Sequence, residues 1–76
     1  MKDAEKVKFV EYLSMSEELK ALSGKGTYLM LEGRSADAEK IAAACVFGDG
    51  GDYMRDYIYG RGREIEALNF NIVRYV

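Results

Sequence analysis

Apolar residues recur at helical spacing in the first part of the chain. Residues 3–22 are rich in Ala, Glu, Lys and Leu and contain no glycine, a composition typical of a helix. The apolar residues on its neighbouring turns are Val7, Val10 and Leu13, with Phe9 beside them. This spacing predicts an amphipathic helix over residues 3–22.

A capping signal lies inside this predicted helix. Ser14 is followed three residues later by Glu17, the spacing of a capping box that opens a helix. We therefore expect a kink or break near Ser14 and a second short helix after it. The helical region should end at residues 24–26, Gly-Lys-Gly, because glycine permits left-handed backbone.

The middle of the chain predicts a strand followed by a helix. Residues 27–32 are short, mostly apolar and bounded by glycines, which favours a strand buried on both faces. After a turn, Ser35 is the expected N-cap of a helix that runs to about Val46 or Phe47. Small apolar residues at helical spacing over residues 38–45 would let this helix lie close to a sheet.

The last third of the chain predicts a β-hairpin. Residues 52–59 carry β-branched and aromatic side chains, and residues 60–63, Gly-Arg-Gly-Arg, predict a turn in which glycine supplies positive φ. The return strand is expected to begin near Glu64. Its apolar residues do not keep one alternation, so either a bulge shifts the phase near Ala67 or both faces are partly covered.

The predicted order α(α)-β-α-β-β indicates a single small α+β domain over residues 1–76. It would have a three-stranded sheet with a C-terminal β-hairpin and with helices packed on one face. Two strand orders fit. In the order 1-3-2, strand three runs antiparallel to both members of a parallel pair, and in the order 1-2-3 the helix joins adjacent parallel strands. The crossover should be right-handed in both.

Composition limits the core and the partners. A chain of 76 residues buries only about 60–65% of its unfolded surface, so dimerisation could supply burial that the core lacks. The net charge of −2 argues against a general affinity for nucleic-acid phosphates. The first residues lack the apolar region of a signal peptide, and no apolar run reaches the ~18 residues of a membrane span. We expect a cytoplasmic protein with no membrane partner.

The residue types present in the chain exclude most kinds of catalytic site. The chain has no histidine, which excludes His-dependent triads and zinc motifs, and Cys45 is its one cysteine. Cys45 lies on the apolar stripe of a predicted helix and is expected to be structural. Asp49, Asp52 and Asp56 cluster around a loop, where they fit turn chemistry better than a metal site. We predict no enzyme activity, no catalytic residue, no metal and no cofactor.

A second loop has the ingredients of an anion site. Gly33, Arg34 and Ser35 precede a predicted helix and offer free amides and a guanidinium. Asp37 and Glu39 follow directly, and their carboxylates would already satisfy the positive end of the helix. Ordinary capping is therefore the favoured interpretation.

The hairpin is the better functional candidate. Alternation along residues 52–59 puts four large polar-tipped side chains on one face, and the turn adds two arginines. We call these six residues the Tyr–Arg hairpin: Tyr53, Arg55, Tyr57, Tyr59, Arg61 and Arg63.

Tyrosine and arginine are the residues of interface hot spots and of base-stacking platforms. We predict a small non-enzymatic protein-interaction or regulatory module. Its partner would be another protein or a second copy of the chain, and it would bind through the Tyr–Arg hairpin or an exposed sheet edge. The alternative is a small nucleic-acid-binding regulator that uses the same surface. A purely structural interpretation also exists, in which the tyrosine rings pack on the helices.

Overall fold

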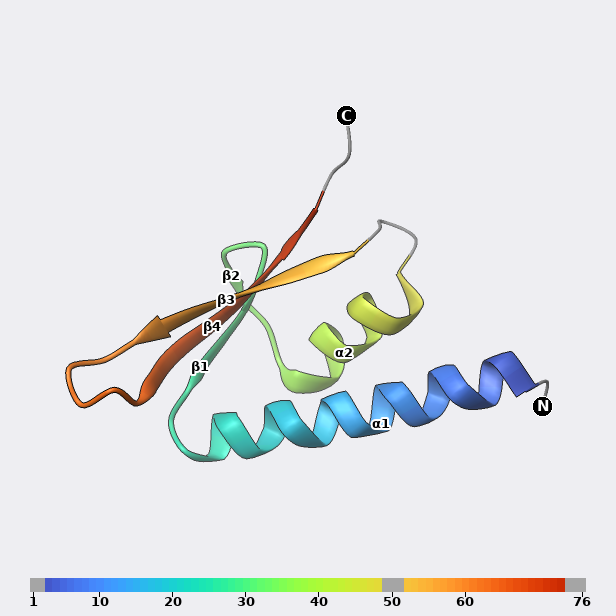
Figure 1. Cartoon of the computed structure of the whole chain (residues 1–76), viewed down its shortest axis with the longest axis horizontal. Coiled ribbons are helices and arrows are strands. Elements are labelled where there is room, and N and C mark those ends of the chain that lie inside the picture. Colours follow the sequence, from blue (N-terminus) through green and yellow to red (C-terminus); the bar gives the residue numbers. More distant parts are fainter. Residues whose placement is uncertain (1–2, 49–51, 74–76) are drawn as a thin grey trace.

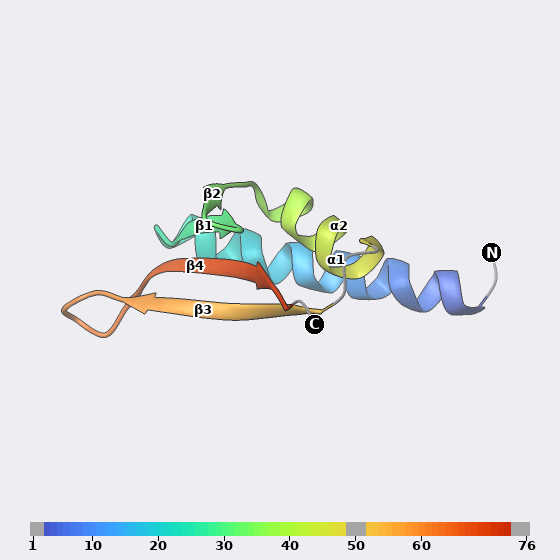
Figure 2. The same cartoon turned by 90° about the horizontal axis from the view of Figure 1, so that it is seen from above.

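The computed structural model describes residues 3–48 and 52–73 and has an α+β fold with two helices and a four-stranded mixed sheet. Both helices cover the same face of the sheet, as Figures 1 and 2 show from two sides. This confirms the predicted class and the one-sided packing. The elements are α1 (Asp3–Gly24), β1 (Tyr28–Leu31), β2 (Arg34–Ser35), α2 (Ala38–Phe47), β3 (Tyr53–Tyr59) and β4 (Ile65–Ile72).

The strands follow the order β2-β1-β4-β3. The return strand β4 lies between β1 and β3, as one of the two predicted orders had it. The predicted orientation was wrong, because β4 is parallel to β1 and antiparallel to β3. The chain reverses direction through β2 before α2 begins. As a result α2 leads to a strand β3 that runs antiparallel to β1, whereas a β-α-β crossover would make the two strands parallel (Figure 1).

The strand β2 was not predicted, because its two residues are too few to carry a pattern. It pairs with β1 through a two-residue turn in which Glu32 (φ 50°) and Gly33 (φ 79°) both have left-handed backbone. That is the geometry of a type I′ hairpin. Hydrogen bonds hold the turn to β4: the Glu32 N–H donates to the Phe70 carbonyl (2.7 Å), and the Gly33 N–H donates to Asn69 Oδ1 (2.9 Å).

The helix α1 is continuous over 22 residues, so the predicted break at Ser14 was wrong. Packing overrides the local capping signal, because Ser16 and Leu19 are buried against the rest of the fold just after that point. The predicted apolar stripe also does not face the core. Met15, Leu19 and Leu22 pack inward, whereas the earlier apolar residues are exposed.

A Schellman motif ends α1. The Thr27 N–H donates to the Leu22 carbonyl and the Gly26 N–H to the Ser23 carbonyl, both at 3.0 Å, and Gly26 has a φ of 98°. The prediction that residues 24–26 end the helix is confirmed. Thr27 continues the connection, since its buried Oγ1 donates to the Ile65 carbonyl (2.8 Å) and ties β1 to β4.

Asp37, and not Ser35, is the N-cap of α2. Its Oδ1 accepts a hydrogen bond from the Lys40 N–H at 2.8 Å. Ser35 cannot serve as the cap because it belongs to β2 and pairs with Met30. The helix ends at Phe47, as predicted. Within the described residues, neither helix is both long enough and apolar enough to cross a bilayer.

The core lies between the two helices and one face of the sheet. Leu68 and Phe70 of β4 point into it. Ile58 of β3 pairs with Ala67 and Tyr59 pairs with Ile65, so Glu66 is an extra residue in β4, and this bulge puts Ile65 on the same face as Leu68 and Phe70. Of the two alternatives left open for this strand, the bulge near Ala67 is therefore present. The buried cluster consists of Leu19, Leu29, Ala38, Ile41, Leu68 and Phe70.

Ile41 provides a test of this packing, because it is fully buried while its neighbour Lys40 is exposed on the same helix. Ile41→Ala should lower the free energy of unfolding by about 2–5 kcal/mol, since it leaves a cavity. Lys40→Ala should change it by less than about 0.5 kcal/mol. Urea unfolding followed by circular dichroism measures both. Equal losses for the two variants would contradict this placement of the core.

Candidate functional site

The tyrosines and Arg55 of β3 lie on the face of the sheet that the helices cover. This follows from the register, because Arg55 pairs with Phe70 and Tyr57 pairs with Leu68, whose side chains are buried in the core. The helices cover the first residues of β3 more than its last residues. Tyr53 packs against the core, whereas Tyr59, at the other end, is 61% exposed. The shared face was predicted correctly, and the helices cover only part of it.

Arg55 connects the edge strand to α1. Its Nη1 and Nη2 donate to the two carboxylate oxygens of Glu18, at 2.9 and 3.0 Å, and its Cζ lies 5.3 Å from the centre of the Phe70 ring. The hydrogen bonds and charge of Arg55 lower the pKa of the Glu18 carboxyl, and the same contacts raise the pKa of Arg55. Both groups are therefore charged at neutral pH, and Arg55 is occupied inside the molecule.

Glu18 was missed in the sequence. It lies 37 residues before Arg55, next to another glutamate, and no local pattern distinguishes it. Only the fold brings the two together. The fork-shaped contact gives Arg55 a positioning role within the predicted site.

Tyr57 and Tyr59 form a stacked pair at the less covered end of this face. Their ring centres lie 6.3 Å apart with an angle of 23° between the planes, and the two residues are 38% and 61% exposed. The Tyr57 hydroxyl accepts a hydrogen bond from Arg55 Nη1 at 3.2 Å. We call Tyr57 and Tyr59 the tyrosine pair; its geometry is fixed by stacking and by the Arg55 contact.

The hairpin turn holds its two arginines in solvent. The Gly60 N–H donates to the Glu64 carbonyl (2.9 Å) and the Arg63 N–H to the Gly60 carbonyl (3.2 Å), which closes a three-residue loop. The prediction that glycine supplies the positive φ here was wrong. Arg63 supplies it, with a φ of 68°, and both Arg61 and Arg63 are exposed.

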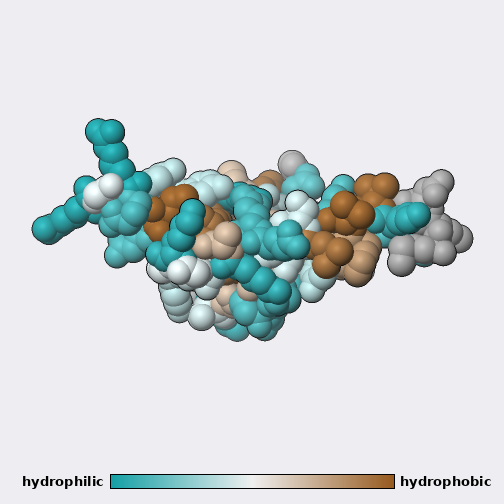
Figure 3. Space-filling model, turned by 90° about the horizontal axis from the view of Figure 1, so that it is seen from below, coloured by the Kyte–Doolittle hydropathy of each residue, from teal (hydrophilic) through white to brown (hydrophobic). Residues whose placement is uncertain are grey.

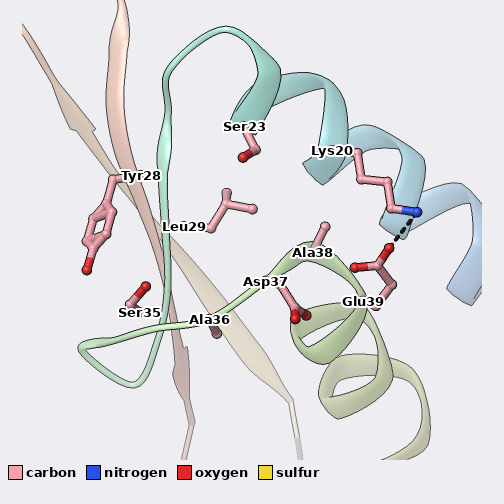
Figure 4. A pocket seen from close by; sticks show the side chains of 9 residues that line it. All are labelled: Lys20, Ser23, Tyr28, Leu29, Ser35, Ala36, Asp37, Ala38 and Glu39. Carbon is pink, nitrogen blue, oxygen red and sulfur yellow. Dashed lines mark ion pairs between the residues drawn. The ribbon is translucent and has the colours of Figure 1, made fainter.

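Ordinary capping was the favoured interpretation of the loop before α2, and the pocket at the start of α2 gives no support to the alternative of an anion site (Figure 4). This pocket has a volume of about 350 Å³, and its lining includes Ser35, Asp37 and Glu39. Lys20 also lines it, but its ammonium group is paired with the Glu39 carboxylate at 2.5 Å. The carboxylates of Asp37 and Glu39 would repel an anion here.

The thiol and the aspartates show no reactive arrangement. Cys45 is half-buried against the core, and burial raises the pKa of its thiol, which keeps it protonated. Asp52 and Asp56 are exposed, and Asp49 lies outside the described residues. Among residues 3–48 and 52–73, no three Cys, Asp or Glu side chains gather as they would around a metal ion.

Two further surfaces carry apolar side chains whose exposure the sequence analysis did not predict. On the uncovered face of the sheet, Met54 is 62% and Ile58 is 42% exposed. On the outer side of α1, Val7 and Val10 are 57% and 60% exposed, and Figure 3 shows an apolar patch over this half of the helix. The exposure of Val7 and Val10 could have been inferred from the sequence. Residues 15, 19 and 22 form a separate apolar stripe, which is enough to pack the helix against the core without Val7 and Val10.

No protein-family model, no curated protein and no solved structure matches this chain.

The Glu18–Arg55 contact predicts a pH dependence of stability. Because the folded protein lowers the pKa of Glu18, the contact stabilises the fold above about pH 4.5 and is lost as the pH falls through the lower, folded value. The effect should be about 1 kcal/mol or less, since the pair is partly exposed. Glu18→Gln should therefore reduce the loss of stability on acidification.

The matched control is Glu11→Gln, which removes an exposed carboxylate from the same helix. Urea midpoints measured from pH 7 to pH 3 should converge for Glu18→Gln and the wild type at the acidic end. If the difference in urea midpoint between Glu18→Gln and the wild type stayed the same at every pH, the prediction would be contradicted.

The backbone of Arg63 generates a second prediction. A left-handed conformation is unfavourable for a residue with a Cβ, so Arg63→Gly should raise the free energy of unfolding by about 1 kcal/mol. Arg61→Gly removes the same charge from a neighbouring position without positive φ and should not stabilise. Thermal unfolding of both variants distinguishes them. Equal shifts would mean that charge, not backbone conformation, sets the effect.

Proposed function

We propose that this chain is a small non-enzymatic protein-interaction module that binds a protein partner through the exposed end of the Tyr–Arg hairpin. The tyrosine pair carries this proposal. Two large rings lie side by side and are partly exposed, and stacking already restricts their rotation. Rigid tyrosines bury much area at a low cost in conformational entropy, which makes them good anchors for a partner.

The rest of the hairpin supports the tyrosine pair. Arg55 binds Glu18 with two hydrogen bonds and Tyr57 with a third, so the base of the surface is fixed to α1. Beyond the pair, Arg61 and Arg63 add two exposed guanidinium groups. A partner that presents an apolar side chain next to carboxylates would match this combination of rings and cations.

Nucleic acid is the alternative partner. The tyrosine pair could stack on bases while Arg61 and Arg63 contact phosphates. Two features favour protein over nucleic acid: Arg55 is already paired with Glu18, and the chain has a net charge of −2. Phosphate binding depends on a concentrated excess of positive charge, which this surface does not have.

Selection from a library of displayed random peptides tests the proposal directly. Peptides enriched on the wild-type protein should lose at least about tenfold in affinity for Tyr59→Ala, because an exposed aromatic anchor contributes about 1–2 kcal/mol or more. The same peptides should bind Met54→Ala normally, since Met54 is exposed on the opposite face of the same strand. Affinities are measured by fluorescence anisotropy.

Two outcomes would count against this function. Enriched peptides that bind Tyr59→Ala as well as the wild type would remove the tyrosine pair from the site. A labelled single-stranded oligonucleotide that binds at low salt, and that is released by Arg61→Ala, would favour the nucleic-acid alternative.

A further inference from the structure

Four residues of α1 lie in one row along its outer side. Their spacings of four, three and four residues match the a and d positions of a heptad, which share one face of a helix. The centre of the row is apolar and its ends carry opposite charges. We call it the outer stripe: Lys6, Val10, Leu13 and Glu17.

The rest of the described fold leaves the outer stripe uncovered. Val10 lies nine residues before the fully buried Leu19, which is about two and a half turns, so the two side chains point to opposite sides of the helix. Val10 and Leu13 are 60% and 44% exposed. Figure 1 shows α2 and the sheet on one side of α1, and Figure 3, which looks from below, shows an apolar patch near the N-terminal part of the molecule.

Neighbouring residues enlarge this surface and set its limit. Val7 is 57% exposed beside Val10, and a shallow hollow of about 480 Å³ lies between Lys6, Val7, Val10 and Glu11. The next position at the same spacing is Lys20, whose ammonium group is paired with Glu39 of α2. The stripe available to a partner therefore ends at Glu17.

We propose that a second copy of this chain covers the outer stripe, with the two α1 helices antiparallel about a two-fold axis between Val10 and Leu13. This arrangement sets Val10 of each copy against Leu13 of the other. It also sets Lys6 of each copy against Glu17 of the other, because both pairs are symmetric about the same point of the sequence. A two-fold interface requires such self-complementarity.

The charges of the outer stripe favour an antiparallel second copy over a parallel dimer or a membrane surface. Parallel helices would place Lys6 against Lys6 and Glu17 against Glu17, which is unfavourable. An anionic membrane surface would need a basic polar face, whereas this side of the helix carries both signs. The heptad spacing matches the shallow crossing of about 20° at which two such helices pack.

This dimer does not depend on the proposed role of the hairpin. The centre of the outer stripe, Val10 and Leu13, belongs to the half of α1 that extends away from the hairpin, toward the opposite end of the molecule (Figure 1). Both tyrosine pairs would stay accessible in the dimer, which would present two copies of the same binding surface. Avidity for a partner with two sites would follow.

Analytical ultracentrifugation of the full chain from micromolar to millimolar concentration tests the dimer. The wild type should show a reversible monomer–dimer equilibrium, and Leu13→Glu should remain monomeric because it places a carboxylate at the centre of the interface. Met54→Glu introduces the same charge on the uncovered face of the sheet and should dimerise like the wild type. Circular dichroism should show an unchanged fold for both variants, since both positions are exposed.

A charge swap tests the antiparallel arrangement. Lys6→Glu alone and Glu17→Lys alone should each weaken the dimer about tenfold, because two attractive contacts become repulsive. The double variant should recover the wild-type dissociation constant. In a parallel dimer, neither single swap would change the number of like-charge contacts.

Three results would overturn this proposal: a wild type that stays monomeric at millimolar concentration, a dimer broken by Met54→Glu and not by Leu13→Glu, or single swaps that leave the dissociation constant unchanged. None of them concerns the tyrosine pair. Peptide binding that depends on Tyr59 would therefore still be measurable on a monomeric variant such as Leu13→Glu.

Discussion

The pairing of β4 with strands on both sides is the interaction on which the rest of the structure depends. β4 hydrogen-bonds to β1 in parallel and to β3 in antiparallel orientation, and its Leu68 and Phe70 are 0% and 1% exposed under the helices. The turn between β1 and β2 and the end of α1 are both fixed to this strand, through Asn69 and Ile65. Two helices packed on β4 and its neighbours can cover only one face of the sheet, so the other face meets solvent.

One-sided packing leaves β3 as an exposed edge strand that the fold partly protects. A bulge interrupts its pairing with β4, and Arg55 points inward from it to bind Glu18, two devices by which natural edge strands avoid uncontrolled pairing. Arg55 also donates a hydrogen bond to the Tyr57 hydroxyl, which helps to fix the tyrosine pair. The Arg55–Glu18 contact thus serves both the protection of the edge and the organisation of the candidate binding surface.

The sequence predicted the class of fold, the order of the longer elements and the residues that share a face of β3, and it left a bulge in β4 as one of two alternatives. It could not predict β2, whose two residues have no periodicity, and without β2 the direction of β4 relative to β1 was wrong. Ser14 and Ser35 were misread because packing and strand pairing override local capping preferences. Glu18 as the partner of Arg55 depends on tertiary structure alone, since 37 residues separate them.

The place of β4 in the chain has a consequence for biosynthesis. Among the described elements, the central strand β4 is synthesised after all the others, and before it emerges the only pairing that the described strands can make is the short one between β1 and β2. A nascent chain that ends before Ile65 lacks the strand against which Leu29 and Ile41 are buried. The apolar helix faces should therefore become buried only after the hairpin has been synthesised.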